Sequence, residues 1–468
     1  MAYLINRYLI KIALSKDTAL TEAQKRIIDK LEKNDSLLVY HGMGTGKTLA
    51  ALAAGEKLNI PVSVVAPASV VGHFENERKK HDVNVGLKAS SYNKPLRDAA
   101  NKLLVFDESQ RMGRLESKRS HLVDEIVGKK KLFMTGTPIR NDPSELIPIL
   151  RGLGLDIPRD KKKFYDTYIQ ETKKHPGLFG WLMGAKPGIE YSIKNESKLR
   201  KMLKNKVDYV EPSKEKFPDV VEEDIIVNMT KPQYKIYRGL LNRNPALAYK
   251  VRRNLPPSKT ESKQLNAFLS AVRQVSNTPI EFTKKEVSLS DEPKIERAKT
   301  EIIKRFKSDP NYRGITYSHY LGSGIKRLSE RLSKENVPVE LFTGELTRKQ
   351  REEIINKFNK GDIKHLLISG AGGEGIDLRG TKLVQVLEPH WNDPTIEQVV
   401  ARAIRYKSHE HLPKSERSVT VQKYYAHPPK RFLRKKEIGV DEYLKMLSSK
   451  KTELNEQFLN VLRDIGRQ

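Results

Sequence analysis

One stretch constrains the fold of this chain more than any other, SLLVYHGMGTGKTLAALAAGEKL at residues 36–58. It begins with an apolar, β-prone run at 36–40, passes through three glycines at alternate positions, and ends in an Ala- and Leu-rich run at 47–58. This pattern predicts a strand, a tight turn and a helix, with Gly55 as the signal that ends the helix. These elements in this order frame a phosphate-binding loop, whereas a chance glycine-rich turn would lack them.

The loop departs from the strict pattern G-x-x-x-x-G-K-[ST] at one position, where His41 replaces the first glycine. We expect His41 to be the last strand residue, so that only the start of the turn differs. The Lys47 amine would reach the β- and γ-phosphate oxygens of ATP, and the Thr48 hydroxyl would bind Mg²⁺. The expected nucleotide-binding residues of the loop are Gly42, Met43, Gly44, Thr45, Gly46, Lys47 and Thr48.

A pair of carboxylates follows in KLLVFDESQRM, residues 102–112, where an apolar run ends in Asp107 and Glu108. Alone, Asp-Glu after an apolar run is typical of a solvated strand end. Paired with Lys47 it predicts a catalytic site, in which Asp107 would hold Mg²⁺ and Glu108 would orient and deprotonate the attacking water.

Further strand-like runs at 62–69 and 131–146 alternate with helical patterns, which favours a parallel sheet. The carboxyl ends of such strands form the working edge, so Thr135, Gly136 and Thr137 are expected beside the nucleotide. A second sheet is predicted from four later runs and one helical run between them: strands at 312–320, 337–346, 364–378 and 381–389, and a helix at 347–361.

The stretch WNDPTIEQVVARAIRY, residues 391–406, predicts a helix with Asp393 as N-cap and Pro394 at its first position. Its polar residues could form a solvated stripe. Alternatively, they could act on the γ-phosphate from the second lobe as arginine fingers, so that hydrolysis is coupled to lobe closure. The spacing i, i+4, i+7 places the candidates on one helical face: Gln398, Arg402 and Arg405.

The run SGAGGEGIDL, residues 369–378, gives the second lobe its own glycine-rich turn. Its glycines permit close approach of the backbone to a nucleotide or a phosphodiester, and an ordinary flexible turn is the alternative. The expected nucleotide-contacting residues of this turn are Gly373, Gly375 and Asp377.

Charge points to a polyanionic partner. The chain has 87 Lys and Arg against 58 Asp and Glu, a net charge of +29. Such an excess fits nucleic acid or an anionic membrane surface, although Lys used only for solubility is the plainer alternative. No apolar run is long enough to span a membrane. With no Cys, disulfides and thiolate metal sites are excluded, which fits an intracellular protein.

Taken together, the motifs resemble the superfamily-two helicases, and within them the Swi/Snf-type double-stranded DNA translocases. HGMGTGKT is similar to the family's DEMGLGKT, which also lacks the first glycine. The resemblance runs from about residue 19 to residue 439. Its other motifs follow in the family's order: APASVVGHFENE, DESQ, TGTPIRNDPSEL, AFLSAVRQVSNTP, TYSHY, LFTGELTRKQREEIINKFN, SGAGGEGIDL and WNDPTIEQVVARAIR.

The resemblance implies an α/β fold with two tandem RecA-like parallel-sheet lobes, a Lys/Arg-rich helical insertion that could grip a duplex, and a C-terminal brace helix. The expected ranges are 1–230 for lobe 1, 231–288 for the insertion, 289–430 for lobe 2 and 431–468 for the brace helix. The tail carries an apolar stripe that fits packing on the lobes or, alternatively, binding of a partner: Leu444, Leu447, Leu454, Phe458 and Val461.

Further site residues follow only from the resemblance. Gln24 would read the adenine base, although TEAQ is also a capping box with Thr21 as N-cap. Strand-tracking contacts with nucleic acid fall on six positions, for which core or capping roles are the alternatives: Ser69, Ser91, Thr135, Ser318, Gly344 and Trp391.

The last motif departs from the family pattern, since the usual RAHRIGQ reads RAIRYKS here. ARAIRYKSHEHLP instead resembles the poxvirus nucleoside triphosphatase I group and related large-DNA-virus or phage enzymes. That implies a viral-type member, acting in the host cytoplasm, the nucleus or the virion.

The resemblance implies a Mg-ATP-driven translocase on double-stranded DNA. Two alternatives stay open. One is a strand-separating helicase on DNA or RNA, although no wedge element is recognisable in the sequence. The other is a nucleic-acid clamp or ATPase subunit of a transcription complex, with RNA polymerase or another protein as partner.

Overall fold

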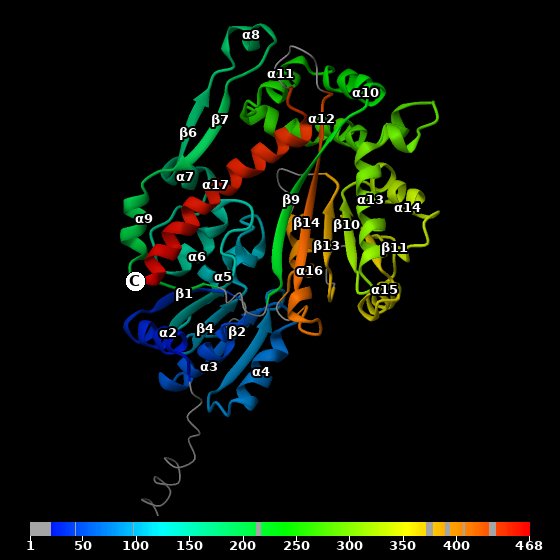
Figure 1. Ribbon diagram of the computed structural model, residues 1–468. Helices are drawn as coiled ribbons and strands as arrows, with labels where there is room; N and C mark the ends of the chain where they lie inside the picture. The colour runs from blue at the N-terminus through cyan, green and yellow to red at the C-terminus, as the bar shows by residue number, and fades with distance from the viewer. Residues whose placement is uncertain are drawn as a thin grey trace, which may run out of the picture. The chain divides into compact units, whose positions relative to one another are not determined.

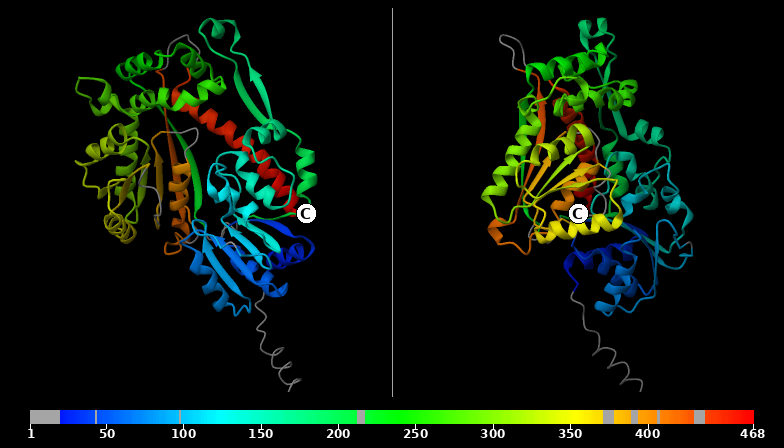
Figure 2. Two further views of the ribbon diagram at one scale, coloured as in Figure 1. Left: turned by 180° about the vertical axis from the view of Figure 1, so that it is seen from behind. Right: turned by 90° about the vertical axis from the view of Figure 1, so that its right-hand side faces the viewer.

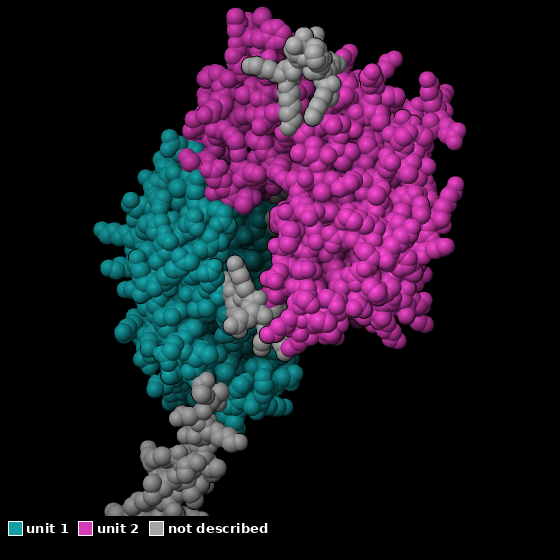
Figure 3. All heavy atoms as spheres, in the orientation of Figure 1, with its two compact units in different colours: residues 1–170, 193–213, 454–468 teal, residues 171–192, 214–453 magenta. Residues whose placement is uncertain are grey.

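The computed structural model describes residues 20–42, 44–96, 98–211, 217–370, 378–388, 394–405, 408–429 and 437–468. Within these residues the strands form two six-stranded sheets and one two-stranded ribbon (Figure 1, Figure 2). The chain divides into two compact units, which Figure 3 colours separately. Unit 1 comprises residues 1–170, 193–213 and 454–468, and unit 2 comprises residues 171–192 and 214–453. No helix in the described part of the chain is long and apolar enough to cross a membrane.

The sheet of unit 1 is parallel throughout and has the order β3-β2-β4-β5-β1-β8. Its strands are β1 (Ser36–His41), β2 (Val62–Ala66), β3 (Leu87–Ser91), β4 (Leu103–Asp107), β5 (Lys130–Thr135) and β8 (Val207–Val210). The helices of unit 1 include α2 (Glu22–Lys33), α3 (Lys47–Lys57), α4 (Val71–Lys80), α5 (Leu122–Glu125), α6 (Ile147–Gly152), α7 (Lys161–Tyr168) and α9 (Glu196–Leu203).

Helices cover both faces of this sheet, which explains why its central strands are mostly apolar on both faces. In β1, Leu37 and Val39 pack into a core with α2, α3 and α4. Leu38 and Tyr40 alternate to the other face, where the core includes α6, α7 and α9. The last part of α17 (Val440–Arg467) adds Leu454, Phe458 and Val461 to that second core, as its apolar stripe predicted.

The sheet of unit 2 is also parallel, with the order β11-β12-β10-β13-β14-β9. Its strands are β9 (Asp219–Asn228), β10 (Gly314–Ser318), β11 (Val339–Phe342), β12 (His365–Ser369), β13 (Leu383–Val386) and β14 (Ser418–His427). Its covering helices are α13 (Pro293–Ser308), α14 (Arg327–Leu332), α15 (Arg348–Lys360) and α16 (Pro394–Ala403). The two sheets confirm the expected α/β class with two parallel-sheet lobes. Strand β9 falls within the range expected for lobe 1, residues 1–230, but it pairs with β14 in the sheet of unit 2.

Unit 2 also holds a helical subdomain that corresponds to the expected insertion, with α10 (Lys231–Leu241), α11 (Pro245–Arg253) and α12 (Lys259–Asn277). Tyr443 and Leu444 from the start of α17 share its core. The two-stranded ribbon, β6 (Ile169–Lys174) and β7 (Gly188–Ile193), carries the short helix α8 (Gly177–Leu182) between its strands.

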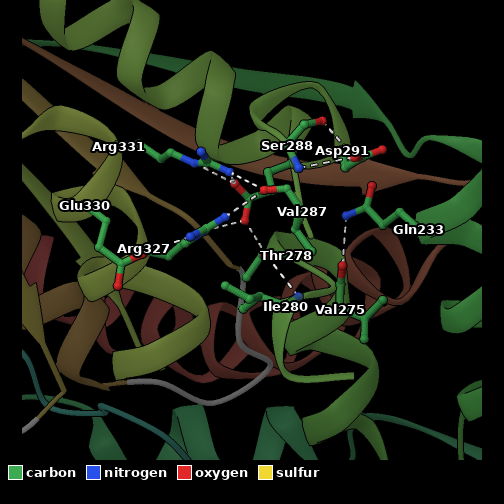
Figure 4. Close-up of polar contacts among 11 residues, drawn as sticks. Gln233, Val275, Thr278, Ile280, Val287, Ser288, Asp291, Arg327, Glu330 and Arg331 are labelled. Carbon is green, nitrogen blue, oxygen red and sulfur yellow. Dashed lines mark hydrogen bonds and ion pairs between the residues drawn. The ribbon is translucent and has the colours of Figure 1, made fainter. Parts of the chain in front are cut away.

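A buried carboxylate joins the insertion to the second lobe (Figure 4). Glu292 is fully buried and accepts from Arg327 Nε at 2.6 Å and from Arg331 Nη2 at 2.7 Å. Thr278, just after α12, donates its hydroxyl to the same carboxylate. Both arginines also donate to the Val287 carbonyl. Two cations on α14 therefore compensate one buried charge that lies before α13.

One expectation about the first helix is wrong. Gly55 does not end α3, which continues to Lys57 and gives way to a turn in which Asn59 takes a positive φ of 53°. Gly55 is required for another reason. A Cβ at this position would lie 2.3 Å from Val62 Cγ2 and 3.1 Å from the Ile60 carbonyl. The glycine therefore permits close packing of the helix against the following strand.

Candidate active site

The phosphate loop follows β1, and His41 is the last residue of that strand, as predicted. The turn uses glycine where L-residues are strained: φ is +77° at Gly44 and +73° at Gly46. Lys47 begins α3 and donates its amine to the His41 carbonyl at 2.9 Å and to the Gly42 carbonyl at 2.8 Å. Met43 lies outside the described residues. The loop therefore holds the lysine amine over its own backbone, beside the N-terminus of α3.

Gln24 lies against this loop. The capping box is present, since Thr21 N donates to Gln24 Oε1 at 2.9 Å and Gln24 N donates to the Thr21 hydroxyl at 3.3 Å. The other end of the same amide, Nε2, donates to the Gly46 carbonyl at 3.1 Å. The capping interpretation is thus confirmed, and the cap also links α2 to the phosphate loop.

The expected carboxylates stand at the end of β4, partly exposed. Glu108 adopts φ +51° and ψ +49°, a left-handed conformation that is unusual for a residue other than glycine. Such strain is a feature of functional sites. Burial, and then the charge of Glu108, raise the pKa of Asp107 to about 6. Burial lowers the pKa of Lys47, while Glu108 and Asp107 act in the opposite direction.

A chain of side-chain hydrogen bonds fixes Glu108. Gln110 donates its amide to the Glu108 carboxylate, and its Oε1 accepts from the Thr135 hydroxyl at 2.6 Å. The Thr135 hydroxyl also accepts from the Thr137 backbone N–H at 3.0 Å. The end of β5 is thus connected to the Glu108 carboxylate through Gln110, whose role was not predicted from the sequence. Its place in DESQ, two residues after Glu108, was the available signal.

A second feature missed from the sequence lies beneath the loop. Asp208 on β8 is fully buried, and its oxygens accept from Arg26 Nε at 2.5 Å, Lys30 Nζ at 3.2 Å and His41 Nε2 at 2.6 Å. Burial alone would raise the pKa of Asp208, but the hydrogen bonds from His41 and Arg26 outweigh it and lower that pKa to about 2. Burial lowers the pKa of His41, so we take its imidazole as neutral, with Nε2–H donating.

The residue that departs from the phosphate-loop pattern is therefore part of a structural connection. His41 joins the start of the loop to Asp208 on β8, and the Gly42 N–H donates to the Val210 carbonyl of that strand at 3.3 Å. Arg26 and Lys30 bring α2, which also carries Gln24, to the same carboxylate.

The candidates of the second lobe are described only in part. Helix α16 begins at Pro394, as predicted, but ends at Ala403, so Arg405 lies in the following turn rather than on the helical face. The expectation of one face for all three candidates is wrong for Arg405, whose N–H donates to the Ser408 hydroxyl at 3.2 Å. The other expected residues, or their side chains, lie outside the described set: the N-cap Asp393, Gly373, Gly375, Asp377, and the side chains of Gln398 and Arg402.

The six expected strand contacts fall into three groups. Ser69 and Gly344 are exposed and Ser91 is partly exposed, whereas Trp391 lies outside the described residues. Thr135 and Ser318 are buried, which is at odds with side-chain contact to a strand. The Thr135 hydroxyl bonds to Gln110, and that of Ser318 donates to Glu388 Oε1 at 2.7 Å. Both hydroxyls therefore serve the interior of their lobes.

Comparisons with known proteins agree with this site. Residues 87–281 match the family model of the SNF2-related domain, and residues 293–407 match that of the helicase conserved C-terminal domain. A protein of Acanthamoeba polyphaga mimivirus, provisionally named ATP-dependent RNA helicase L538, is 29% identical over 94% of this chain and 96% of its own length. The termination factor NPH-I homolog of an African swine fever virus isolate is 24% identical over 88% of this chain and 75% of its own length.

A solved structure described as the Sulfolobus solfataricus SWI2/SNF2 ATPase core in complex with dsDNA is 20% identical, with a TM-score of 0.35 over 88% of each chain. The order of the two matched domains fits the two parallel-sheet lobes. Asp107 and Glu108 lie within the SNF2-related match, and the phosphate loop precedes that match in the same sheet. The chain thus carries an SNF2-related domain and a helicase conserved C-terminal domain, which indicate an ATPase of the P-loop helicase type.

Proposed function

We propose that this chain is a motor that hydrolyses ATP to ADP and phosphate while it tracks on double-stranded DNA. One observation carries the proposal: the Lys47 amine and the Asp107 and Glu108 carboxylates share one electrostatic environment at the carboxyl edge of the unit 1 sheet. This is the set of groups that phosphoryl transfer to water needs, a cation for the phosphates and a carboxylate for the nucleophile.

The donor set at this edge fits Mg²⁺. Thr48 supplies a hydroxyl and Asp107 a carboxylate, both partly exposed, and Mg²⁺ is commonly held by one or two such oxygens together with phosphates and water. The repulsion between Asp107 and Glu108 that raises the pKa of Asp107 is the kind that a divalent cation relieves. A bound Mg²⁺ would neutralise charge on the phosphate oxygens.

The chain's own residues divide the remaining work. The N–H groups from Gly42 to Thr48 would cradle the phosphates, with Lys47 turned from the loop carbonyls to the β- and γ-oxygens. Glu108, held by Gln110, would orient the attacking water and accept its proton. We retain Gln24 as the adenine contact, although each end of its amide already has one partner in the chain.

The second lobe would complete the site when the lobes close. We assign the γ-phosphate contacts to Gln398, Arg402 and Arg405, and a supporting nucleotide contact to the turn with Gly373, Gly375 and Asp377. Arg405 lies beyond the end of α16, so its reach depends on the turn rather than on the helix.

Double-stranded DNA is the partner that we propose for the motor. The net charge of +29 suits a polyanion, and the resemblance of the motifs to those of Swi/Snf-type double-stranded DNA translocases favours a duplex as the track. Contacts to backbone phosphates predict an affinity that falls steeply with salt and depends little on base sequence. Ser69, Ser91, Gly344 and Trp391 remain our candidates for the strand contacts.

The experiment that tests the proposal is the ATPase rate without nucleic acid and with duplex DNA, single-stranded DNA or RNA, with Glu108→Gln as the blank. Stimulation by duplex DNA supports the translocase. A preference for single strands or RNA overturns it in favour of a strand-separating helicase.

A second candidate function is that of an ATPase subunit in transcription termination. It is favoured by the name of the African swine fever virus relatives, termination factor NPH-I homolog. In that case purified RNA polymerase would stimulate the ATPase where free nucleic acids do not.

A further inference from the structure

The strands β6 and β7 form an arm with α8 at its end (Figure 1), and α8 and the residue after it form a tip with exposed apolar side chains. The exposed fractions are 77% for Leu178, 60% for Phe179, 70% for Trp181, 66% for Leu182 and 43% for Met183. These are five of the ten large apolar residues that are exposed in the described part of the chain, and they fall within six consecutive positions. Exposed apolar side chains gathered in this way mark an interaction site more often than scattered ones do.

The tip is held in place from the side of the insertion. The Tyr249 hydroxyl of α11 donates to the Pro176 carbonyl at 3.1 Å, and the rings of Tyr249 and Phe179 lie 6.0 Å apart. A Cβ on Gly180 would lie 2.6 Å from the Tyr249 ring, so the glycine allows α8 to approach α11 closely. The chain thus fixes the base of the tip and leaves its apolar side chains in water.

The ribbon below the tip is fixed by similar contacts. The Ile189 N–H donates to the Pro257 carbonyl at 3.2 Å. Glu171 pairs with Lys259 at 2.6 Å, and Glu190 pairs with Lys174 at 3.2 Å. An element anchored along its length, with its largest apolar residues exposed only at its end, is built to present that end.

The charge around the tip is positive. Both carboxylates of the arm, Glu171 and Glu190, are already paired with lysines. Lys173 and Lys186 are exposed and make no ion pair within the described residues. The adjoining segment 231–260, which contains α10 and α11, has eight Lys or Arg and no Asp or Glu. Three of these cations are paired with carboxylates: Lys250 with Glu261, Arg252 with Glu437 and Lys259 with Glu171. The other five are exposed and make no ion pair within the described residues. The tip is therefore an apolar surface in a part of the chain that carries unpaired cations.

Two kinds of macromolecule could cover such a surface. Leu178, Trp181 and Leu182 have the spacing i, i+3, i+4, which suits a protein groove. Nucleic acid offers apolar base faces and anionic phosphates within one ligand, and the surplus of cations around the tip favours it. A protein groove would have to bring its own carboxylates to match the same cations.

We propose that the α8 tip is an apolar wedge, which places Leu178, Trp181 and Leu182 against the bases of the DNA while the five exposed, unpaired cations of 231–260 contact the neighbouring phosphates. Apolar side chains inserted at a base step unstack it and kink the duplex. This inference rests on the proposed DNA-tracking function and adds a base-opening element to it, the element that the sequence did not reveal.

The test is the triple substitution Leu178→Ser, Trp181→Ser, Leu182→Ser, with Val127→Ser as the control. Val127 is 65% exposed in unit 1, so the control also removes an exposed apolar side chain. The probe is a forked duplex with 2-aminopurine at the junction, used at one fixed salt concentration because phosphate contacts depend on salt. Base opening is read from 2-aminopurine fluorescence and affinity from anisotropy, and circular dichroism establishes that each variant is folded.

We expect wild type and Val127→Ser to raise the 2-aminopurine fluorescence and the triple variant to leave it unchanged. The triple variant should also bind the fork about tenfold or more weakly, since stacking on one base contributes roughly five- to 150-fold in affinity. Equal signals from the triple variant and wild type would overturn the wedge, as would an unchanged signal from wild type. The ATPase rate of the wild type on plain duplex DNA separates a failure of the wedge from a failure of the DNA-tracking motor. Stimulation without base opening rejects the wedge alone, and no stimulation by any nucleic acid rejects the DNA-tracking motor.

Discussion

The carboxyl edges of the two parallel sheets are alike in backbone and different in how their polar groups are used. In unit 1 the edge carries Lys47, Asp107 and Glu108, all partly exposed. The two carboxylates repel each other, and the backbone of Glu108 is strained. In unit 2 the described part of the edge carries Ser318 and Glu388, both buried. Glu388 Oε1 accepts from the Ser318 hydroxyl at 2.7 Å and from the His319 N–H at 3.0 Å.

The difference shows what makes a sheet edge catalytic. At the second edge, Glu388 Oε1 is satisfied by Ser318 and His319, whereas Glu388 Oε2 is buried and has no hydrogen-bond partner among the described residues. The carboxylate is thus closed off inside the lobe. At the first edge, the charges remain partly hydrated and only partly compensated within the chain, so that a nucleotide can complete them. Local sequence does not separate the two cases, because each edge appears as an apolar run followed by polar residues.

The largest expected difference between the two edges is in kcat, when one carboxylate at each edge is replaced. Glu108→Gln should lower kcat for ATP hydrolysis by about 10²- to 10⁴-fold, because it removes the proposed general base. Glu388→Gln should leave kcat unchanged and lower the thermal midpoint, because its carboxylate only satisfies backbone and hydroxyl donors. Steady-state ATPase assays and thermal unfolding of both variants check this. A large loss of kcat in Glu388→Gln would show that the second edge also takes part in the chemistry.

Local signals explain how much could be predicted. The run 36–58 contains its own strand, turn and helix signals, so the phosphate loop and Lys47 were placed correctly between β1 and α3. The apolar run that ends in Asp107 and Glu108 likewise placed these two residues at the end of β4. The partner of His41 is 167 residues away on β8, and no local pattern marks it. Gly55 was misread because a glycine needed for close helix–strand packing looks the same in sequence as one that ends a helix.

Buried carboxylates offer a second way to compare the units. Glu292→Gln should destabilise unit 2 by about 3–5 kcal/mol, since it leaves Arg327 and Arg331 next to a buried neutral amide. The KM for ATP should stay as in wild type, because the cluster connects the insertion to the second lobe and contains no proposed ATP contact. Urea unfolding and ATPase titrations measure both quantities. Glu330→Gln is the matched control, since Glu330 pairs with the same Arg327 but is 62% exposed, and it should cost no more than about 1 kcal/mol.

Asp208→Asn should affect the KM for ATP more, and the free energy of unfolding less, than Glu292→Gln does. We expect a smaller destabilisation, about 2–3 kcal/mol, because Arg26 is partly exposed and can return to water. The KM for ATP should rise, because His41 and α2 lose the charge that holds them beside the phosphate loop. The same two assays apply. If the variant keeps the wild-type KM, Asp208 stabilises the fold only, as we expect for Glu292.

The smallest expected effect is the pH dependence of the difference in free energy of unfolding between wild type and Asp208→Asn. The folded pKa of Asp208, about 2, lies below its ordinary value of 3.8. Its contribution to stability is therefore complete above about pH 4 and is lost as the pH falls through about 2. The difference in free energy of unfolding between wild type and Asp208→Asn should narrow over that interval. Urea titrations at successive pH values measure it.

The control for this narrowing is Glu22→Gln on α2, the helix that carries Arg26 and Lys30. Glu22 is 87% exposed and pairs only with Lys25 three residues away, so solvent screens its interaction and the difference from wild type should stay small at every pH. A constant gap for Asp208→Asn would mean that its carboxylate contributes by shape and hydrogen bonding rather than by charge. The cluster beneath the phosphate loop would then resemble the hydrogen-bonded network of Ser318 and Glu388 at the second edge. The electrostatic contrast between the two units would be confined to Lys47, Asp107 and Glu108.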